Sequence, residues 1–198
     1  MIKKNSFDNK GYTLVELLAV IVVMVVVGVI ITGILVSSLR GGSKSNVLDN
    51  VTQNGNNAIV QMSKMISYAK NFNGISTDNI TYTTNCTQVI PPSPSPTPTP
   101  VAYKYIKITA FDGGTTVFGC NGPSDSPPNT IASNASSLID ATSVAVSSCY
   151  FSCTQSGFGQ IPTIGINFTL QQASASSFAE KTATVPFETS ITMRNITF

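Results

Sequence analysis

The chain has 198 residues, of which 42% are hydrophobic and only 10% are charged, with a formal net charge of +2. This charged fraction is less than half of the roughly 25% usual in soluble domains. The basic residues are scattered, which argues against a nucleic-acid site built on a clustered Lys/Arg surface. The sequence contains no histidine, which excludes His-based catalytic triads and His metal sites.

The first predicted element is a long apolar helix over residues 12–36. Twenty of its 25 residues are apolar, and Glu16 is its only charged residue. At 1.5 Å per residue such a helix is about 37 Å long, enough to cross a bilayer core of about 30 Å. The alternative is a buried core helix, but a soluble helix that is apolar on all sides over this length would be unusual. We therefore expect a membrane-spanning helix.

Residues 1–11 precede this helix and carry Lys3, Lys4 and Lys10 against Asp8. Positive charge ahead of a spanning helix holds that end in the cytoplasm. We therefore expect a single-pass protein of the cytoplasmic (inner) membrane, with its remaining chain outside. A secretory signal peptide has a shorter apolar region of about 7–15 residues and a small-residue cleavage site after it. The apolar run here is longer and is followed by no such site.

The junction between leader and helix reads KGYTLVELL over residues 10–18. It resembles the cleavage and methylation signal of type IV pilins and pseudopilins, which combines a short basic leader, a glycine, a hydrophobic stretch and an acid five residues past the cut. The family usually has Phe where this chain has Tyr12. The resemblance implies that a prepilin peptidase cuts after Gly11, and that Tyr12 becomes the N-methylated first residue of the mature protein.

Glu16 has a physical interpretation beside this resemblance. A carboxylate inside a membrane segment costs several kcal/mol, about 2.5–3.5 on insertion scales, unless it is paired. Cleavage after Gly11 creates an α-amino group at Tyr12, and that amine on a neighbouring subunit is a natural partner for the carboxylate. The resemblance implies the same subunit-docking role. The alternative is a Glu16 side chain that extends to the cytoplasmic membrane surface.

An amphipathic continuation of the helix is expected over residues 37–72, with its helical pattern clearest over 44–71. Arg40 marks the outer membrane boundary, the glycine pair 41–42 predicts a break or bend, and Gly55 predicts a kink. Apolar residues recur at helical spacing; they are Val47, Val51, Ala58, Met62, Met65, Ile66 and Ala69. The resemblance implies that this stripe packs against a sheet, so the two methionines are interpreted as core residues rather than metal ligands.

Residues 73–198 are predicted to form a β-rich head, which gives an α+β fold with a mainly antiparallel sheet. Strands are expected at 103–110 and 115–119, joined as a hairpin by Asp112-Gly113-Gly114. Further strands are expected at 144–151, 164–170 and 185–193, where apolar residues alternate with polar ones. The last of these segments resembles the terminal strand of J-class pseudopilins and related minor pilins.

A proline-rich insert occupies residues 91–100. Alternating proline excludes helix and central strand and predicts polyproline II. The insert is interpreted as a solvated spacer, with an O-glycosylated stretch or a docking ligand as alternatives.

The four cysteines are Cys86, Cys120, Cys149 and Cys153. All lie on the predicted exported side, and an even number there favours two disulfides with three possible connectivities. If Cys149 and Cys153 lay on an extended strand, their Cα atoms would be about 13 Å apart, beyond the bridging limit of about 7 Å. A local bond therefore requires the strand to end or bulge. The pairing Cys86–Cys120 with Cys149–Cys153 is favoured. The alternative is a zinc site formed by all four cysteines, although the closely spaced cysteine pairs typical of such sites occur once at most, at Cys149 and Cys153.

No catalytic site is expected. A nucleophilic Ser or Cys needs a positioned base, and the carboxylates that could form a pair are widely spaced. These carboxylates are Asp112, Asp125, Asp140, Glu180 and Glu188. Asp112, Asn121 and Asp125 could ligate Ca²⁺ through oxygens, but ordinary turn residues explain them as well. No metal and no cofactor are therefore predicted.

These features together predict a minor pilin or pseudopilin, a structural subunit of a type IV pilus-like filament that serves pilus assembly, adhesion or DNA uptake. Two alternatives stay open: a pseudopilin of a type II secretion-like system, and a membrane-anchored surface adhesin that does not polymerise. The expected partners are the prepilin peptidase, other pilin or pseudopilin subunits, the assembly platform in the cytoplasmic membrane, and the lipid bilayer before assembly. The final location is an extracytoplasmic or cell-surface filament.

Overall fold

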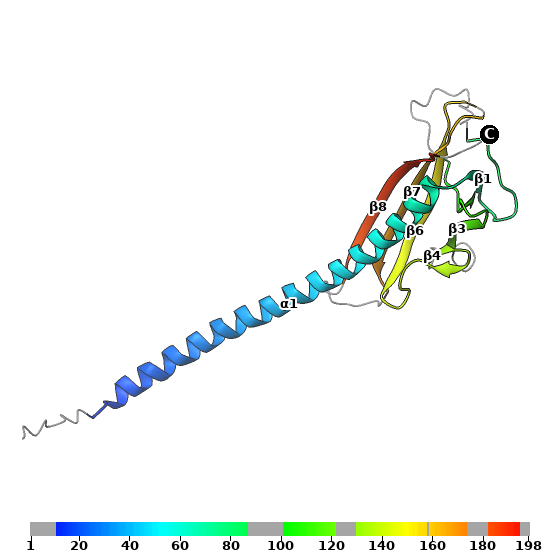
Figure 1. The fold of residues 1–198 in the computed structure, drawn as a ribbon. Helices are drawn as coiled ribbons and strands as arrows, with labels where there is room; N and C mark the ends of the chain where they lie inside the picture. The colour runs from blue at the N-terminus through cyan, green and yellow to red at the C-terminus, as the bar shows by residue number, and fades with distance from the viewer. Residues whose placement is uncertain (1–10, 87–100, 122–129, 158, 174–181, 195–198) are drawn as a thin grey trace, which may run out of the picture. The chain divides into compact units, whose positions relative to one another are not determined.

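A computed structural model of the chain describes residues 11–86, 101–121, 130–157, 159–173 and 182–194. One helix is followed by eight strands in these residues (Figure 1), which confirms the predicted α+β fold. The leader up to Lys10 and the proline-rich insert 91–100 lie outside the described residues, as do Asp125 and Glu180. The chain divides into two compact units, Met1–Gly42 and Ser43–Phe198, which are treated separately below.

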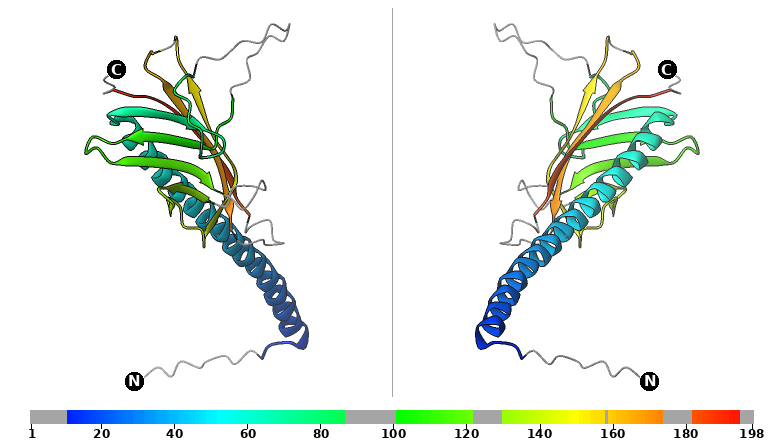
Figure 2. Two further views of the ribbon diagram at one scale, coloured as in Figure 1. Left: turned by 90° about the vertical axis from the view of Figure 1, so that its right-hand side faces the viewer. Right: turned by 90° about the vertical axis from the view of Figure 1, so that its left-hand side faces the viewer.

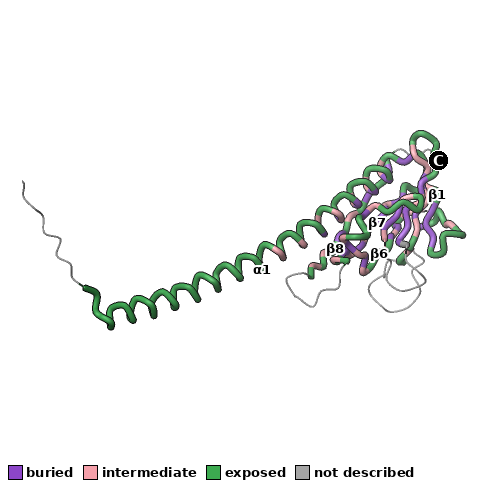
Figure 3. Tube along the Cα trace, turned by 90° about the horizontal axis from the view of Figure 1, so that it is seen from below, coloured by how far each residue is buried: buried purple, intermediate pink, exposed green. Residues whose placement is uncertain are grey.

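The helix α1 spans Leu14–Ser67. Every residue from Gly11 to Gly42 is exposed, which Figure 3 shows as an unbroken green stretch at the start of the helix. The helix continues through Gly41 and Gly42, so the predicted break is wrong. A glycine lowers helix stability by only about 1 kcal/mol, which the hydrogen bonds of the adjoining turns outweigh.

In the second unit, α1 buries one stripe spaced three or four residues apart; the buried residues are Val51, Gly55, Ala58, Met62 and Ile66. This confirms Met62 as a core residue, whereas Met65 is 37% exposed. The helix ends at Ser67, four residues before the predicted end at 71. Just after this point the Lys70 N–H donates to Thr109 O at 2.8 Å. The chain therefore pairs with a neighbouring strand instead of continuing the helix.

Five antiparallel strands in sequential order form the first sheet, called sheet A here; they are β1 (Asn71–Ser76), β2 (Tyr105–Thr109), β3 (Thr115–Asn121), β4 (Thr130–Ser133) and β5 (Ser136–Ser137). The predicted hairpin is confirmed, because β2 and β3 pair from Tyr105↔Gly119 to Thr109↔Thr115. Gly113 takes the positive φ of the connecting turn, at 86°.

Three antiparallel strands form the second sheet, sheet B; they are β6 (Val144–Thr154), β7 (Thr163–Gln172) and β8 (Thr184–Thr192). The predicted alternation of β7 and β8 is confirmed, because Ile164, Ile166, Phe168 and Leu170 are all buried and the apolar residues of β8 pair with them. A bulge between Val146 and Ser148 shifts the alternation of β6 by one residue.

The core of the head lies where α1 meets the inner faces of both sheets. Figures 1 and 2 show the cyan part of α1 crossing one face of the sheets. Phe168 and Phe187 stack with their ring centroids 5.1 Å apart. The ring of Phe187 lies directly over Gly55 of α1, which therefore allows a close approach rather than the predicted kink.

Asp140 fixes the connection from sheet A to β6. Its backbone N–H donates to Asn54 Oδ1 of α1 at 3.0 Å, and its carboxylate accepts from the hydroxyls of Thr142 and Ser143, each at 2.6 Å. These bonds, led by that from Ser143, lower the pKa of Asp140. Asp140 therefore has a structural role in a turn.

The contact of Gly55 with Phe187 predicts the effect of adding one methyl group. A Cβ at Gly55 would overlap the ring of Phe187, whereas a Cβ at Gly42 meets nothing within 4 Å. Overpacking costs about 1–3 kcal/mol, more than the helix propensity gained from alanine. We expect Gly55→Ala to lower the melting temperature by about 2–6 °C and the matched Gly42→Ala to leave it unchanged or higher. Circular dichroism of the chain in detergent measures both, and equal melting temperatures would contradict the packing.

Two hydrogen-bonded carboxylates predict acid sensitivity of the head. The N–H of Ile80, the hydroxyl of Ser76 and the N–H of Thr81 hold the pKa of Asp78 at about 2, against an ordinary 3.8. Because the pKa of Asp78 and that of Asp140 are lowered on folding, their stabilisation is complete above the unfolded-state pKa and is lost as pH falls through the folded-state pKa. Stability should therefore decline between about pH 4 and pH 2.

The double variant Asp78→Asn/Asp140→Asn should have a smaller loss of stability across this pH range, measured by urea unfolding at each pH. Glu188→Gln, at an exposed carboxylate of β8, is the control and should keep the slope of the natural chain. An unchanged slope in the double variant would show that other groups control the acid response.

Candidate functional site

The helix begins directly after the predicted cleavage site. Gly11, Tyr12 and Thr13 are not helical, and α1 starts at Leu14. Tyr12 is 82% exposed, and the space around Gly11 is open to 4 Å. The bond between Gly11 and Tyr12 thus lies in exposed, non-helical backbone, the kind of segment in which proteolytic cleavage is favoured.

Thr13 caps the helix. Its Oγ1 accepts from the Glu16 N–H at 3.3 Å, and its carbonyl oxygen accepts from the Leu17 N–H at 3.2 Å. Thr-x-x-Glu is the capping-box pattern, in which the threonine satisfies an N–H group that lacks an intrahelical partner. Sequence reasoning missed this cap, although the spacing of Thr13 and Glu16 could have revealed it.

The cap gives Glu16 a second physical role. Glu16 lies in the first turn of α1, where the positive end of the helix dipole favours a carboxylate by about 0.3–1 kcal/mol in exposed positions. That gain is smaller than the several kcal/mol that membrane burial of a lone carboxylate costs. The helix terminus alone therefore does not compensate the charge of Glu16 in an apolar environment.

Beyond Glu16 the helix presents a continuous apolar surface. The large hydrophobic side chains from Tyr12 to Leu39 are each 44–82% exposed. The helix is long and apolar enough to cross a membrane. Exposed apolar patches of this extent mark lipid or protein contact surfaces.

Two disulfides are present, but the predicted pairing is wrong. Cys86 bonds to Cys153 and Cys120 to Cys149, with Cα–Cα distances of 5.4 and 5.6 Å. The strand β6 continues through both of its cysteines to Thr154. It neither ends nor bulges between them, so the local bond Cys149–Cys153 is geometrically excluded.

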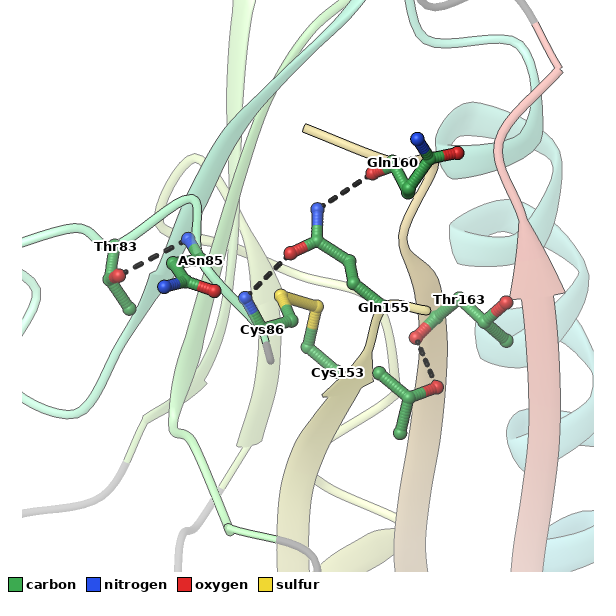
Figure 4. The surroundings of a disulfide bond; sticks show 8 residues. Thr83, Asn85, Cys86, Cys153, Gln155, Gln160 and Thr163 are labelled. Atoms are coloured by element: carbon green, nitrogen blue, oxygen red, sulfur yellow. Dashed lines mark hydrogen bonds between the residues drawn. A yellow bond between two sulfur atoms is a disulfide. The ribbon is translucent and has the colours of Figure 1, made fainter. Parts of the chain in front are cut away.

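Both disulfides attach the first part of the head to β6. Cys120 lies on β3 of sheet A, so its bond to Cys149 joins the two sheets. Near the other disulfide, the Cys86 N–H donates to Gln155 Oε1 at 2.7 Å, and Gln155 Nε2 donates to Gln160 O at 2.8 Å (Figure 4). The segment that ends at Cys86 is thereby held at the end of β6 by a covalent bond and a side-chain bridge.

Of the oxygen ligands considered for Ca²⁺, only the side chain of Asp112 lies within the described residues. Asp112 Oδ1 accepts from the Gly114 N–H at 2.9 Å within the β2–β3 turn, which is a turn role. Asp125 and the side chain of Asn121 lie outside the described residues. Among the residues that are described, no three His, Cys, Asp or Glu side chains come together as a metal site.

No protein-family model matches the chain, and no curated protein or solved structure is significantly similar to it. The architecture fits that of pilin-like proteins, because one long N-terminal apolar helix precedes antiparallel sheets.

The connectivity predicts the cost of removing each disulfide. The bonds close loops with sequence separations of 67 and 29 residues, and the chain-entropy relation gives about 4.4 and about 3.6 kcal/mol for such loops. We expect Cys86→Ala/Cys153→Ala to lower the melting temperature at least as much as Cys120→Ala/Cys149→Ala. Peptide mapping without reductant should recover Cys86 linked to Cys153, and a Cys86–Cys120 peptide would contradict the structure.

Proposed function

We propose that this chain is a minor pilin or pseudopilin, a structural subunit of a type IV pilus-like filament. The observation that carries the proposal is the position of the Gly11–Glu16 motif, immediately at the capped start of an exposed apolar helix that leads into a β-rich head. A long proline-rich insert and a loop-rich head favour a low-copy subunit over the major one.

In this proposal the precursor enters the cytoplasmic membrane with residues 1–11 inside and the head outside. The prepilin peptidase removes the leader after Gly11, and Tyr12 is N-methylated. The leader contains three lysines and one aspartate, so the mature chain is formally neutral. The positive charge of the precursor then sets membrane orientation and does not remain to repel neighbouring subunits.

Assembly then moves the apolar helix from lipid into a filament core, with the assembly platform supplying subunits. The helix exchanges one apolar environment for another, so its large hydrophobic side chains remain covered throughout. The chain is a substrate of the peptidase and a building block, with no enzymatic role.

During this transfer, Glu16 fixes the axial offset between the helices of neighbouring subunits. Its carboxylate loses water when the helix packs among others, and the α-amino group of Tyr12 on a neighbouring subunit restores the charge balance. The pair forms only when the two helices are correctly offset along their axes. A mismatched offset leaves both charges buried and unpaired.

Two alternatives predict different phenotypes. A pseudopilin of a type II secretion-like system is favoured by the C-terminal strand β8, whose segment resembles that of J-class pseudopilins; its deletion would abolish secretion of exported proteins. A surface adhesin that does not polymerise would need α1 only as an anchor, and Glu16 would then have no role in assembly.

A three-variant series separates docking from helix capping. Glu16→Gln and Glu16→Ala remove the charge, whereas Thr13→Ala removes the cap, at about 0.5–2 kcal/mol, and keeps the carboxylate. We expect both Glu16 variants to be processed normally yet to fall at least tenfold in filaments sheared from cells, with Thr13→Ala incorporated. Immunoblots of sheared filaments and membranes provide the readout.

Normal incorporation of Glu16→Gln would contradict the docking role. Equal losses in Thr13→Ala and Glu16→Ala, with Glu16→Gln incorporated normally, would assign Glu16 to the cap instead, because Gln also fits the capping box.

A further inference from the structure

The outer face of sheet A carries a hollow between strands β2, β3 and β4. The register aligns Tyr105 with Gly119 and Gly119 with Ala132, so these three residues form one row across the strands. Ile106 and Phe118, on the opposite face, are fully buried in the core. Gly119 and Ala132 are both buried, and with little or no side chain they line the hollow together with Tyr105.

This hollow has a volume of about 280 Å³, and its described lining is completed by Val117, Asn79, Asn134 and Ala135. None of the described residues that line it is charged. A site of this kind favours a neutral ligand, because an ion would lose its hydration without gaining an opposite charge. Its volume is just below the roughly 300 Å³ at which pockets for drug-sized ligands begin, so the ligand is small or is the end group of a chain.

Strained backbone is concentrated at the same place. Within the described residues, the only residues other than glycine with positive φ are Asn79 at 63°, Asn134 at 48° and Ala135 at 70°, and all three line the hollow. Asparagine tolerates this conformation, but alanine is disfavoured by about 1–2 kcal/mol. Such outliers cluster at ligand sites.

The strain at Ala135 has a specific origin. Ser133 pairs with Ser136, so Asn134 and Ala135 form a two-residue hairpin turn with positive φ at both positions. Turns of this type prefer glycine at the second position, as in Asn-Gly. This chain instead keeps a methyl group there, and that residue faces the hollow.

Hydrogen bonds hold the two amides of the hollow in place. Asn134 Oδ1 accepts from the Val117 N–H at 2.8 Å, and its Nδ2 donates to Thr115 O at 3.3 Å. Asn79 Oδ1 accepts from the Tyr82 hydroxyl. Each amide nitrogen has two N–H groups, so these bonds use one N–H of Asn134 and neither N–H of Asn79.

A second aromatic residue, Tyr82, lies beside Asn79 of the hollow. Lys107 Nζ lies 5.2 Å from the centroid of the Tyr82 ring. Burial, together with the nearby Tyr105 and Asp78, raises the pKa of Tyr82. Tyr82 therefore borders the hollow through Asn79, to which its hydroxyl donates.

We propose that this hollow binds one pyranose ring of a neutral saccharide. Such a ring has an apolar face that packs on an aromatic side chain, here Tyr105. Its hydroxyl groups both donate and accept hydrogen bonds, which the side-chain amides of Asn79 and Asn134 match. The fixed amides and the strained turn give a preformed site, which lowers the entropic cost of binding. The site goes beyond the filament role proposed above and does not depend on it.

The test uses the full-length chain in lauryldimethylamine oxide micelles, because glycoside detergents would compete. Saturation-transfer NMR is recorded with the methyl glycosides of glucose, galactose, mannose and N-acetylglucosamine. Each free sugar is run beside its glycoside, because a site for chain-end sugars accepts the methyl group and a site for free sugars does not. We expect transfer to at least one glycoside, and absence of transfer to every sugar would overturn the proposal.

Tyr105→Ala should weaken binding of that glycoside at least fivefold while leaving the melting temperature within a few degrees. Tyr150→Ala is the matched control, because Tyr150 is a 36% exposed tyrosine on β6 of sheet B, and it should bind as the natural chain does. Equal binding by Tyr105→Ala and Tyr150→Ala would place the sugar elsewhere and overturn the proposal.

The variant Ala135→Gly distinguishes an effect on glycoside binding from an effect on the stability of the fold. Glycine relieves the strain, so this variant should melt at a higher temperature yet bind the glycoside more weakly, because the methyl contact is lost and the turn is less rigid. A higher melting temperature with unchanged affinity would contradict the role of the turn in binding. Filament incorporation should be normal in these variants, which distinguishes failure of this site from failure of the filament proposal.

Discussion

One helix serves two different environments, and the other features of the molecule follow from this constraint. From Leu14 to Val36 the helix α1 is apolar, apart from Glu16, one threonine and two glycines, and exposed on every side, whereas from Val51 to Ile66 it buries a single stripe. The first part is stable only when lipid or other proteins cover it. The second part completes the core of a folded head in water. In the proposed assembly, the head keeps its structure while the apolar part moves from lipid into a filament core.

The head achieves its stability with few apolar residues. The stripe of α1 supplies one side of the core, and the contact between Gly55 and Phe187 brings the helix close to sheet B. Two disulfides add to this packing, and both end on β6. Covalent links of this kind are expected where a small core is combined with long connections.

The sequence predicted those parts of the fold in which the pattern of side chains repeats. Alternation of Ile164, Ile166, Phe168 and Leu170 identified β7, and the Asp-Gly-Gly turn identified the β2–β3 hairpin. By contrast, β1 was missed because its Asn71–Ser76 sequence contains Gly74 at a bulge and shows no alternation. The short strands β4 and β5 contain too few residues for a period to appear.

The candidate sites likewise differ in whether the sequence could predict them. The motif at Gly11, Tyr12 and Glu16 is local in sequence, so its position at the start of a helix could be predicted. Disulfide pairing depends on which strands become neighbours, and the continuation of β6 past Cys153 was not visible from spacing. The hollow beside Tyr105 arises from residues on separate strands and loops, together with positive φ values that composition does not reveal.

The intact mass of the protein isolated from its native membrane would show whether the leader is removed after Gly11 while the apolar helix is retained. We expect the mass of residues 12–198 with two disulfides and one N-methyl group, and fragmentation should place that methyl group on the amine of Tyr12. A full-length mass, or a chain that begins after Val36 and lacks the apolar helix, would contradict the expected processing.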